Sequence, residues 1–208
     1  MGRNSGGGAG GSAPKNSKPG RGDFGFKGKI ENIRSLVTVK DMAVYKELKE
    51  GISRFESALG VRQRNVKIAN MQSGVMGVHA TVGGKTDGVY LNSRYFDQSK
   101  KWIHDNLKRQ MDNGWQTKTK KPVQHVVIHE LGHALWNNHM TTPNALAAAP
   151  AVQKLYRTWL KDKKKKGYGE YSKTNVSEFW AETCAKATRG DQDRYTRGIK
   201  GIVKKYKL

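Results

Sequence analysis

The sequence predicts a protein of the α+β class, and three observations predict it. The first third carries a long amphipathic helical stripe, the middle holds short segments rich in Val, Tyr and Ile between glycine-containing turns, and the remainder returns to helical periodicity. Apolar residues at three- and four-residue steps indicate helices, and short β-branched segments bounded by turns indicate strands. We expect a small mixed or antiparallel sheet packed on a helix, followed by a helical C-terminal subdomain.

The expected elements follow in chain order. The first helix spans residues 41–59, and strands are expected within residues 61–70, 75–82 and 88–93. A second helical stripe contains Phe96, Ile103, Leu107 and Met111 and ends near Asn113 and Gly114. This order places the sheet between two helices.

The second half is expected to be helical. Pro122 suits the first turn of a helix that contains residues 125–136, because proline at that position lacks only an N–H that the helix leaves unpaired. A loop is expected from His139 to Asn144, and a helix over residues 145–160 despite Pro150. Asn175 and Glu178 resemble a capping box for a helix that ends near Gly190, and a final amphipathic helix covers residues 195–206.

Length and composition favour one domain with a tail. Residues 1–22 are mostly Gly, Ser, Asn, Lys and Arg, which predicts a flexible basic tail without a signal peptide, and residues 23–208 are long enough for one domain. No segment approaches the twenty apolar residues of a membrane span, so we expect a soluble, cytosolic or cytosol-delivered protein. The formal net charge of +22 predicts attraction to nucleic acid or another polyanion.

The segment His129-Glu130-Leu131-Gly132-His133 predicts a metal site. Residues four apart lie on one face of a helix, so His129 and His133 can present two imidazole nitrogens to one tetrahedral zinc ion. Glu130 lies beside that ion, where it could accept a proton from a metal-bound water. The surrounding residues are apolar, and a buried imidazole pair and carboxylate need polar partners.

A catalytic zinc ion needs a third protein ligand, and two residues are candidates. Glu178 is favoured because it begins a second apolar helix, and Glu182 lies one turn further on the same face, where it could accept a hydrogen bond from His129 or His133. His139 is the alternative, at a spacing used when the chain turns sharply after the helix. That turn normally contains Gly where this sequence has Trp136.

The HELGH segment, Tyr171, Thr174-Asn175 and the segment from Glu178 to Glu182 together resemble the catalytic domain of anthrax lethal factor and its relatives, which are zinc metallopeptidases of the gluzincin type found in bacteria and phages. The resemblance implies a zincin-like fold and one Zn2+ ion bound by His129, His133 and Glu178. It also implies Glu130 as general base, Tyr171 as the phenol that stabilises the oxyanion, and residues 88–92 as the edge strand that receives a peptide substrate. Tyr168 is an alternative to Tyr171.

Two functions remain open from the sequence. The first is a zinc-dependent endopeptidase that cleaves a protein or peptide substrate. The second is a nucleic-acid-associated or virion-packaged structural protein that has a zincin fold with little or no peptidase activity. Its sequence support is the basic tail and the lysine runs at residues 118–121 and 163–166. All catalytic positions carry competent residues, which favours the enzyme.

Overall fold

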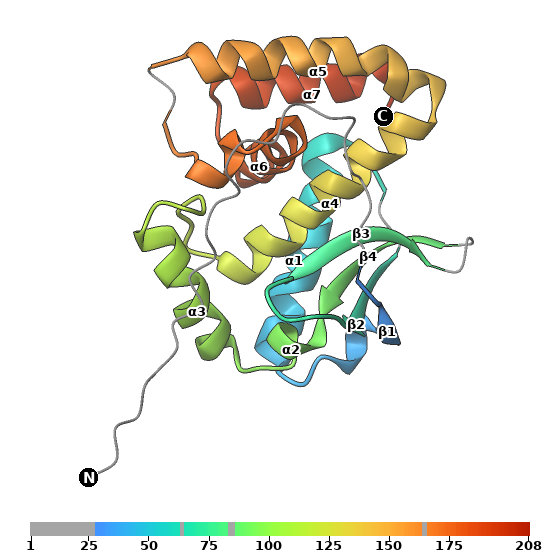
Figure 1. The fold of residues 1–208 in the computed structure, drawn as a ribbon, viewed down its shortest axis with the longest axis vertical. Coiled ribbons are helices and arrows are strands. Elements are labelled where there is room, and N and C mark those ends of the chain that lie inside the picture. The colour runs from blue at the N-terminus through green and yellow to red at the C-terminus, as the bar shows by residue number, and fades with distance from the viewer. Residues whose placement is uncertain (1–27, 63–64, 83–85, 164–165) are drawn as a thin grey trace.

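The computed structural model describes residues 28–62, 65–82, 86–163 and 166–208, and only the backbone of residues 81–82, 86–87 and 137–141. The predicted tail, residues 1–22, lies outside the described residues. Figure 1 shows a small sheet on one side of the molecule and helices over the rest of it. No helix in the described ranges combines the length and the apolar composition that crossing a bilayer requires.

The sheet has four strands and is mixed, as predicted. Its strands are β1 (Glu31–Ser35), β2 (Val66–Asn70), β3 (Gly77–Val82) and β4 (Thr86–Asn92). The order across the sheet is β1-β2-β4-β3, with β2 parallel to β4 and the other two pairs antiparallel. The prediction that residues 88–92 form an edge strand is therefore wrong, because β4 lies between β2 and β3. The edge strand next to α4 is β3.

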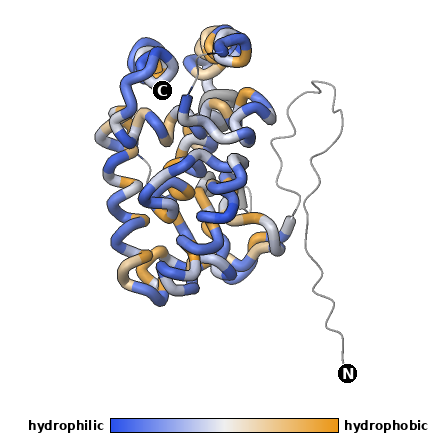
Figure 2. The backbone as a smooth tube through the Cα atoms, turned by 90° about the vertical axis from the view of Figure 1, so that its left-hand side faces the viewer, coloured by the Kyte–Doolittle hydropathy of each residue, from blue (hydrophilic) through white to orange (hydrophobic). Residues whose placement is uncertain are grey.

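The described helices make up the rest of the fold. They are α1 (Met42–Leu59), α2 (Ser93–Phe96), α3 (Lys100–Asp112), α4 (Pro122–Thr141), α5 (Pro143–Lys161), α6 (Val176–Arg189) and α7 (Arg194–Tyr206), with short 3-10 helices η1 (Leu36–Thr38) and η2 (Glu170–Lys173). Along α1 and α3, hydrophobic and hydrophilic residues alternate in short stretches, which is the pattern of helices with one buried face (Figure 2). The predicted α+β class is confirmed.

Several boundaries differ from the sequence prediction. The expected loop from His139 to Asn144 is wrong, because α4 continues to Thr141 and α5 begins at Pro143. The Thr142 hydroxyl accepts a hydrogen bond from Ala145 N and caps α5 in the single residue between the helices. Phe96 belongs to the short helix α2 and not to α3. Strand β1 and η1 were not predicted, since their sequence lacks strong periodicity.

Helix α4 is the centre of the fold. It packs against α1, α3, α5, α6 and strand β3, and residues 123–132 are buried on every side of the helix. A helix that is buried all round has no side turned to solvent, so the polar side chains of this segment need partners inside the protein. The packing of α4 therefore decides where the predicted site lies.

Helices α4 and α6 approach closely at Gly132. A Cβ atom on Gly132 would lie 2.8 Å from Ala181 Cα, so any side chain there would separate the two helices. The Gly132 carbonyl also accepts a hydrogen bond of 3.0 Å from Trp180 Nε1. Gly132 is therefore a point of close approach between α4 and α6.

Substituting Gly132 with Ala is expected to destabilise the fold by about 1–3 kcal/mol, because the new methyl group overlaps the α6 backbone. Urea unfolding followed by circular dichroism measures this change. Gly201→Ala is the matched control, since a Cβ there meets no atom within 4 Å, and it should keep or raise stability because alanine favours helix. Equal midpoints for Gly132→Ala and wild type would contradict the close approach.

Candidate metal centre

Two helices place the four predicted side chains of the centre. His129 and His133 lie one turn apart on α4, and Glu178 and Glu182 lie one turn apart on α6. The N-terminus of α6 is capped by Asn175, because Asn175 Oδ1 accepts a hydrogen bond of 2.9 Å from Glu178 N. The α6 cap is thus formed by Asn175, while the Glu178 side chain turns toward α4.

Three side-chain atoms converge in a small triangle. His129 Nε2 lies 3.0 Å from His133 Nε2. Glu178 Oε2 lies 3.1 Å from His129 Nε2 and 3.2 Å from His133 Nε2. Ligands about 2.0–2.1 Å from a tetrahedral zinc ion stand roughly 3.3 Å from one another, so the triangle has nearly the size that zinc requires. His129, His133 and Glu178 are also the group of described residues that could hold one metal ion.

The second nitrogen of each imidazole is already engaged. His129 Nδ1 lies 2.9 Å from Glu182 Oε1, and His133 Nδ1 lies 3.0 Å from Ser177 Oγ. An ionised carboxylate only accepts hydrogen bonds, so His129 Nδ1 carries the proton and its Nε2 lone pair points at the triangle. When His133 Nδ1 donates to Ser177 Oγ, lone pairs on His129 Nε2, His133 Nε2 and Glu178 Oε2 meet without a proton between them, which suits a cation.

The electrostatics of the triangle favour positive charge there. Burial disfavours a charged His129, but Glu178 and Glu182 outweigh burial and raise the pKa of His129 well above its usual value. Burial likewise opposes an ionised Glu178, yet the His129 and His133 rings hold the pKa of that carboxyl far below its usual range. A metal ion would satisfy all three groups at once.

Glu182 connects the centre to the rest of the protein. Its two carboxylate oxygens accept hydrogen bonds from Thr117 Oγ1 at 2.5 Å and from His125 Nε2 at 3.2 Å, in addition to His129. Burial disfavours an ionised Glu182, but His125 and His129 outweigh burial and hold the pKa of Glu182 well below its usual value. The predicted role of Glu182 as an outer partner agrees with the contact to His129, whereas Ser177 serves His133.

The carboxylate of Glu130 lies against bare backbone. A Cβ atom on Gly77 of β3 would lie 2.7 Å from Glu130 Cγ and 3.1 Å from Glu130 Oε1. Burial raises the pKa of Glu130, although the neighbouring His133 and His129 rings oppose that rise. A carboxylate with a raised pKa holds a proton more readily, which suits a group that accepts and later returns one.

Tyr171 lies beside the centre on η2. Its ring centroid is 5.8 Å from that of His129 and 5.5 Å from that of Trp115. Burial and the nearby Glu178 and Glu130 carboxylates raise the pKa of Tyr171, so its phenol stays neutral and able to donate. Tyr168, the alternative, packs in a separate aromatic cluster with Trp159.

The alternative third ligand, His139, lies in the last turns of α4. The sharp turn that would bring it back to the metal is not present, because α4 continues as a helix from Pro122 to Thr141. The side chain of His139 lies outside the described part of the structure. The geometry at the triangle favours Glu178.

A cleft of about 290 Å³ opens onto the centre. Its lining comes from the start of β3 and the segment before it, from α3 and the segment after it, and from α4, η2 and α6. The residues are Gly74, Val75, Met76, Gly77, Gln110, Trp115, Gln116, His125, Val126, His129, Glu130, Tyr171 and Glu182. Both Glu130 and Tyr171 face this cleft. The cleft therefore gives a ligand access to the groups predicted to react.

Sequence reasoning missed four participants. Ser177, Thr117 and His125 support the predicted residues through hydrogen bonds, and Gly77 makes room for Glu130. The His125 spacing, one turn before His129, was a visible signal of a shared helix face. Thr117 and Gly77 carried no signal, since they come from distant segments.

Comparison with models of known protein families gives no match, and comparison with curated proteins and with solved structures gives none either.

Glu182→Gln is expected to lower zinc affinity by about 10- to 100-fold, because the neutral amide holds His129 less well and withdraws negative charge from it. Competition with a zinc-binding chelator measures the affinity. Glu170→Gln is the control, since Glu170 is exposed and pairs with Lys173, away from the metal ligands. Unchanged affinity in Glu182→Gln would show that this carboxylate does not support the metal ligands.

Proposed function

We propose that this protein is a zinc-dependent metallopeptidase with a zincin-like fold. The observation that carries the proposal is the triangle formed by His129 Nε2, His133 Nε2 and Glu178 Oε2. The two histidines and one carboxylate leave a fourth position for water or substrate, as catalytic zinc sites do. The cleft beside the triangle supports catalysis over a purely structural metal.

When bound, zinc supplies a Lewis acid that activates a water and polarises the carbonyl under attack. Glu130 is positioned to accept the proton of that water, and its raised pKa helps it to pass the proton on to the leaving amine. The buried setting of Glu130 keeps bulk water from competing for the proton. Glu130 is therefore proposed as the general base and then the general acid.

Tyr171 is proposed to stabilise the oxyanion. Its neutral phenol lies on the cleft side of His129 and keeps its proton, so it can donate a hydrogen bond where negative charge develops. A donor aimed at the transition state lowers the barrier more than it tightens substrate binding. The backbone of Tyr171 is fixed by a hydrogen bond of 3.0 Å from its N–H to Trp115 O.

A peptide substrate is supported by the position of β3. This strand pairs with β4 on one side, forms an edge of the described sheet on the other, and packs against α4. Met76 and Gly77 at its start also line the cleft. An extended peptide that pairs with β3 would pass the metal centre, which gives β3 the substrate role that the sequence assigned to residues 88–92.

Purified wild-type protein is expected to contain about one zinc ion per chain, because three protein ligands converge. Glu178→Ala should lose most of the metal, while His139→Ala should keep it. Elemental analysis of the three proteins measures this. Zinc that depends on His139 and not on Glu178 would contradict the assigned ligands, and wild type without any metal would refute the proposed enzyme.

Glu130→Gln is expected to keep zinc and to lose about 10²- to 10⁴-fold of the peptidase rate, since the amide cannot accept the proton. Cleavage of unfolded casein, followed by mass spectrometry, provides the assay. Cleavage at the same rate in wild type and in Glu130→Gln would mean that the activity comes from elsewhere.

Gly77→Ala should lower kcat/KM by about 10- to 100-fold with zinc content unchanged, because the added methyl group displaces the Glu130 carboxylate. The same casein assay and elemental analysis report both quantities. Gly201→Ala, in open space on α7, is the matched control. Full activity in Gly77→Ala would rule out a positioning role for β3.

A further inference from the structure

Helices α5 and α7 form an outer layer that carries only positive charge. They lie side by side at one end of the molecule in Figure 1, and Figure 2 shows them together at the same end. Neither residues 143–161 nor residues 194–208 contain an Asp or Glu. The apolar sides of both helices are buried, with Val152 and Trp159 of α5 and Ile199 and Val203 of α7 in the protein interior. The polar sides face outward.

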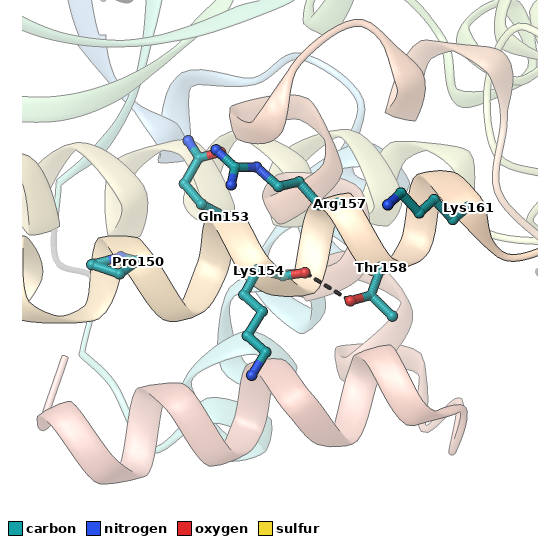
Figure 3. Close-up of a pocket in the computed structure, with 6 residues that line it drawn as sticks. All are labelled: Pro150, Gln153, Lys154, Arg157, Thr158 and Lys161. Carbon is teal, nitrogen blue, oxygen red and sulfur yellow. Dashed lines mark hydrogen bonds between the residues drawn. The ribbon is translucent and has the colours of Figure 1, made fainter.

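Six exposed cations define this surface, which we call the basic face. They are Lys154, Arg157 and Lys161 of α5 and Arg197, Lys204 and Lys205 of α7. On α5 the three cations recur at steps of three and four residues, so they share one side of the helix. Figure 3 shows them along the pocket that they line together with Pro150, Gln153 and Thr158.

The cations of the basic face lack ion pairs with carboxylates among the described residues. Arg194, at the start of α7, is different because it pairs with Asp162 at 3.2 Å. Several cations elsewhere are paired, as Lys101 is with Asp105 and Lys108 with Asp112. In the basic region near residues 118–121, Lys121 pairs with Glu50, which also pairs with Arg54. The basic face is therefore one of the regions where the excess positive charge of the protein lies without paired carboxylates.

Unpaired, exposed cations in rows attract an extended polyanion. A phosphate backbone carries regularly spaced negative charges, and its binding releases condensed counterions, which favours association. The α5 cations are about 4.5 and 6 Å apart along the helix axis, from the helical rise of 1.5 Å per residue. That spacing lets neighbouring cations reach successive phosphates.

The composition of the basic face favours duplex nucleic acid over two other polyanions. Membrane-surface helices insert a broad apolar face, whereas Leu146 and Leu160 are the large apolar residues exposed on α5, and α7 exposes none. Single strands bind through stacking on exposed aromatic rings, and Tyr156 and Tyr206 are partly buried. What the face offers is mainly positive charge, which suits contacts to a phosphate backbone.

We propose that the basic face formed by α5 and α7 binds the phosphate backbone of double-stranded nucleic acid without sequence preference. The proposal is independent of the metal centre, because no residue of the basic face lines the cleft at His129. It gives a nucleic-acid interaction to a protein that also carries the proposed peptidase site.

The test compares two variants of the full chain with equal net charge. One replaces four cations of the basic face, Lys154, Arg157, Arg197 and Lys204, with Gln. The control replaces four paired cations, Arg54, Lys101, Lys108 and Lys121, with Gln. Binding to a short DNA duplex of arbitrary sequence is measured by fluorescence anisotropy at several salt concentrations, and binding to phosphatidylserine vesicles by sedimentation.

The basic-face variant should bind the duplex at least about tenfold more weakly, and the slope of log K against log salt should become shallower by about 2 to 4, as expected when several phosphate contacts are lost. The control should change either quantity much less, and zinc content should stay equal in all three proteins. Equal losses in both variants would overturn the proposal, since net charge alone would then explain binding. The proposal would also be overturned if the wild type did not bind the duplex. The same holds if the basic-face variant lost binding to vesicles but kept binding to the duplex.

Discussion

The contact between α4 and α6 at Gly132 and Ala181 is the constraint on which the rest of the site depends. Because no side chain separates the helices there, the carboxylates of Glu178 and Glu182 come within hydrogen-bond distance of the imidazoles on α4. The Trp180 indole, bonded to the Gly132 carbonyl, fixes the same approach in a second place. A helix spacing wider by the width of one methyl group would open the triangle of donor atoms.

Burial on every side of α4 gives this contact its importance. A buried helix that carries two imidazoles and a carboxylate must pair them, since unpaired buried polar groups cost several kcal/mol. The protein meets this demand with Glu182, which binds His125, His129 and Thr117 and so joins α4, α6 and the segment before α4. These three hydrogen bonds to one carboxylate explain how a polar centre persists inside an apolar core.

Much of this centre could be predicted from the sequence, because its main residues lie at helical spacings. His129 and His133, and Glu178 and Glu182, repeat at four residues, and the Asn175 cap marks where α6 begins. Sheet order could not be predicted in the same way, since the residues of β4 read alike in an inner and an edge strand. Contacts from other segments, such as Ser177 to His133, depend on how the chain packs in three dimensions.

Gly77 brings the edge strand against the Glu130 carboxylate, and this has a mechanical consequence. The backbone of β3 touches Glu130 directly, so a displacement of the strand by a fraction of an ångström must move the carboxylate too. An incoming chain that pairs with β3 would straighten or shift it and thereby reset the alignment of Glu130. Substrate docking and proton transfer would then be linked through one strand, and a poorly pairing peptide would be handled slowly even when its scissile bond reaches the metal.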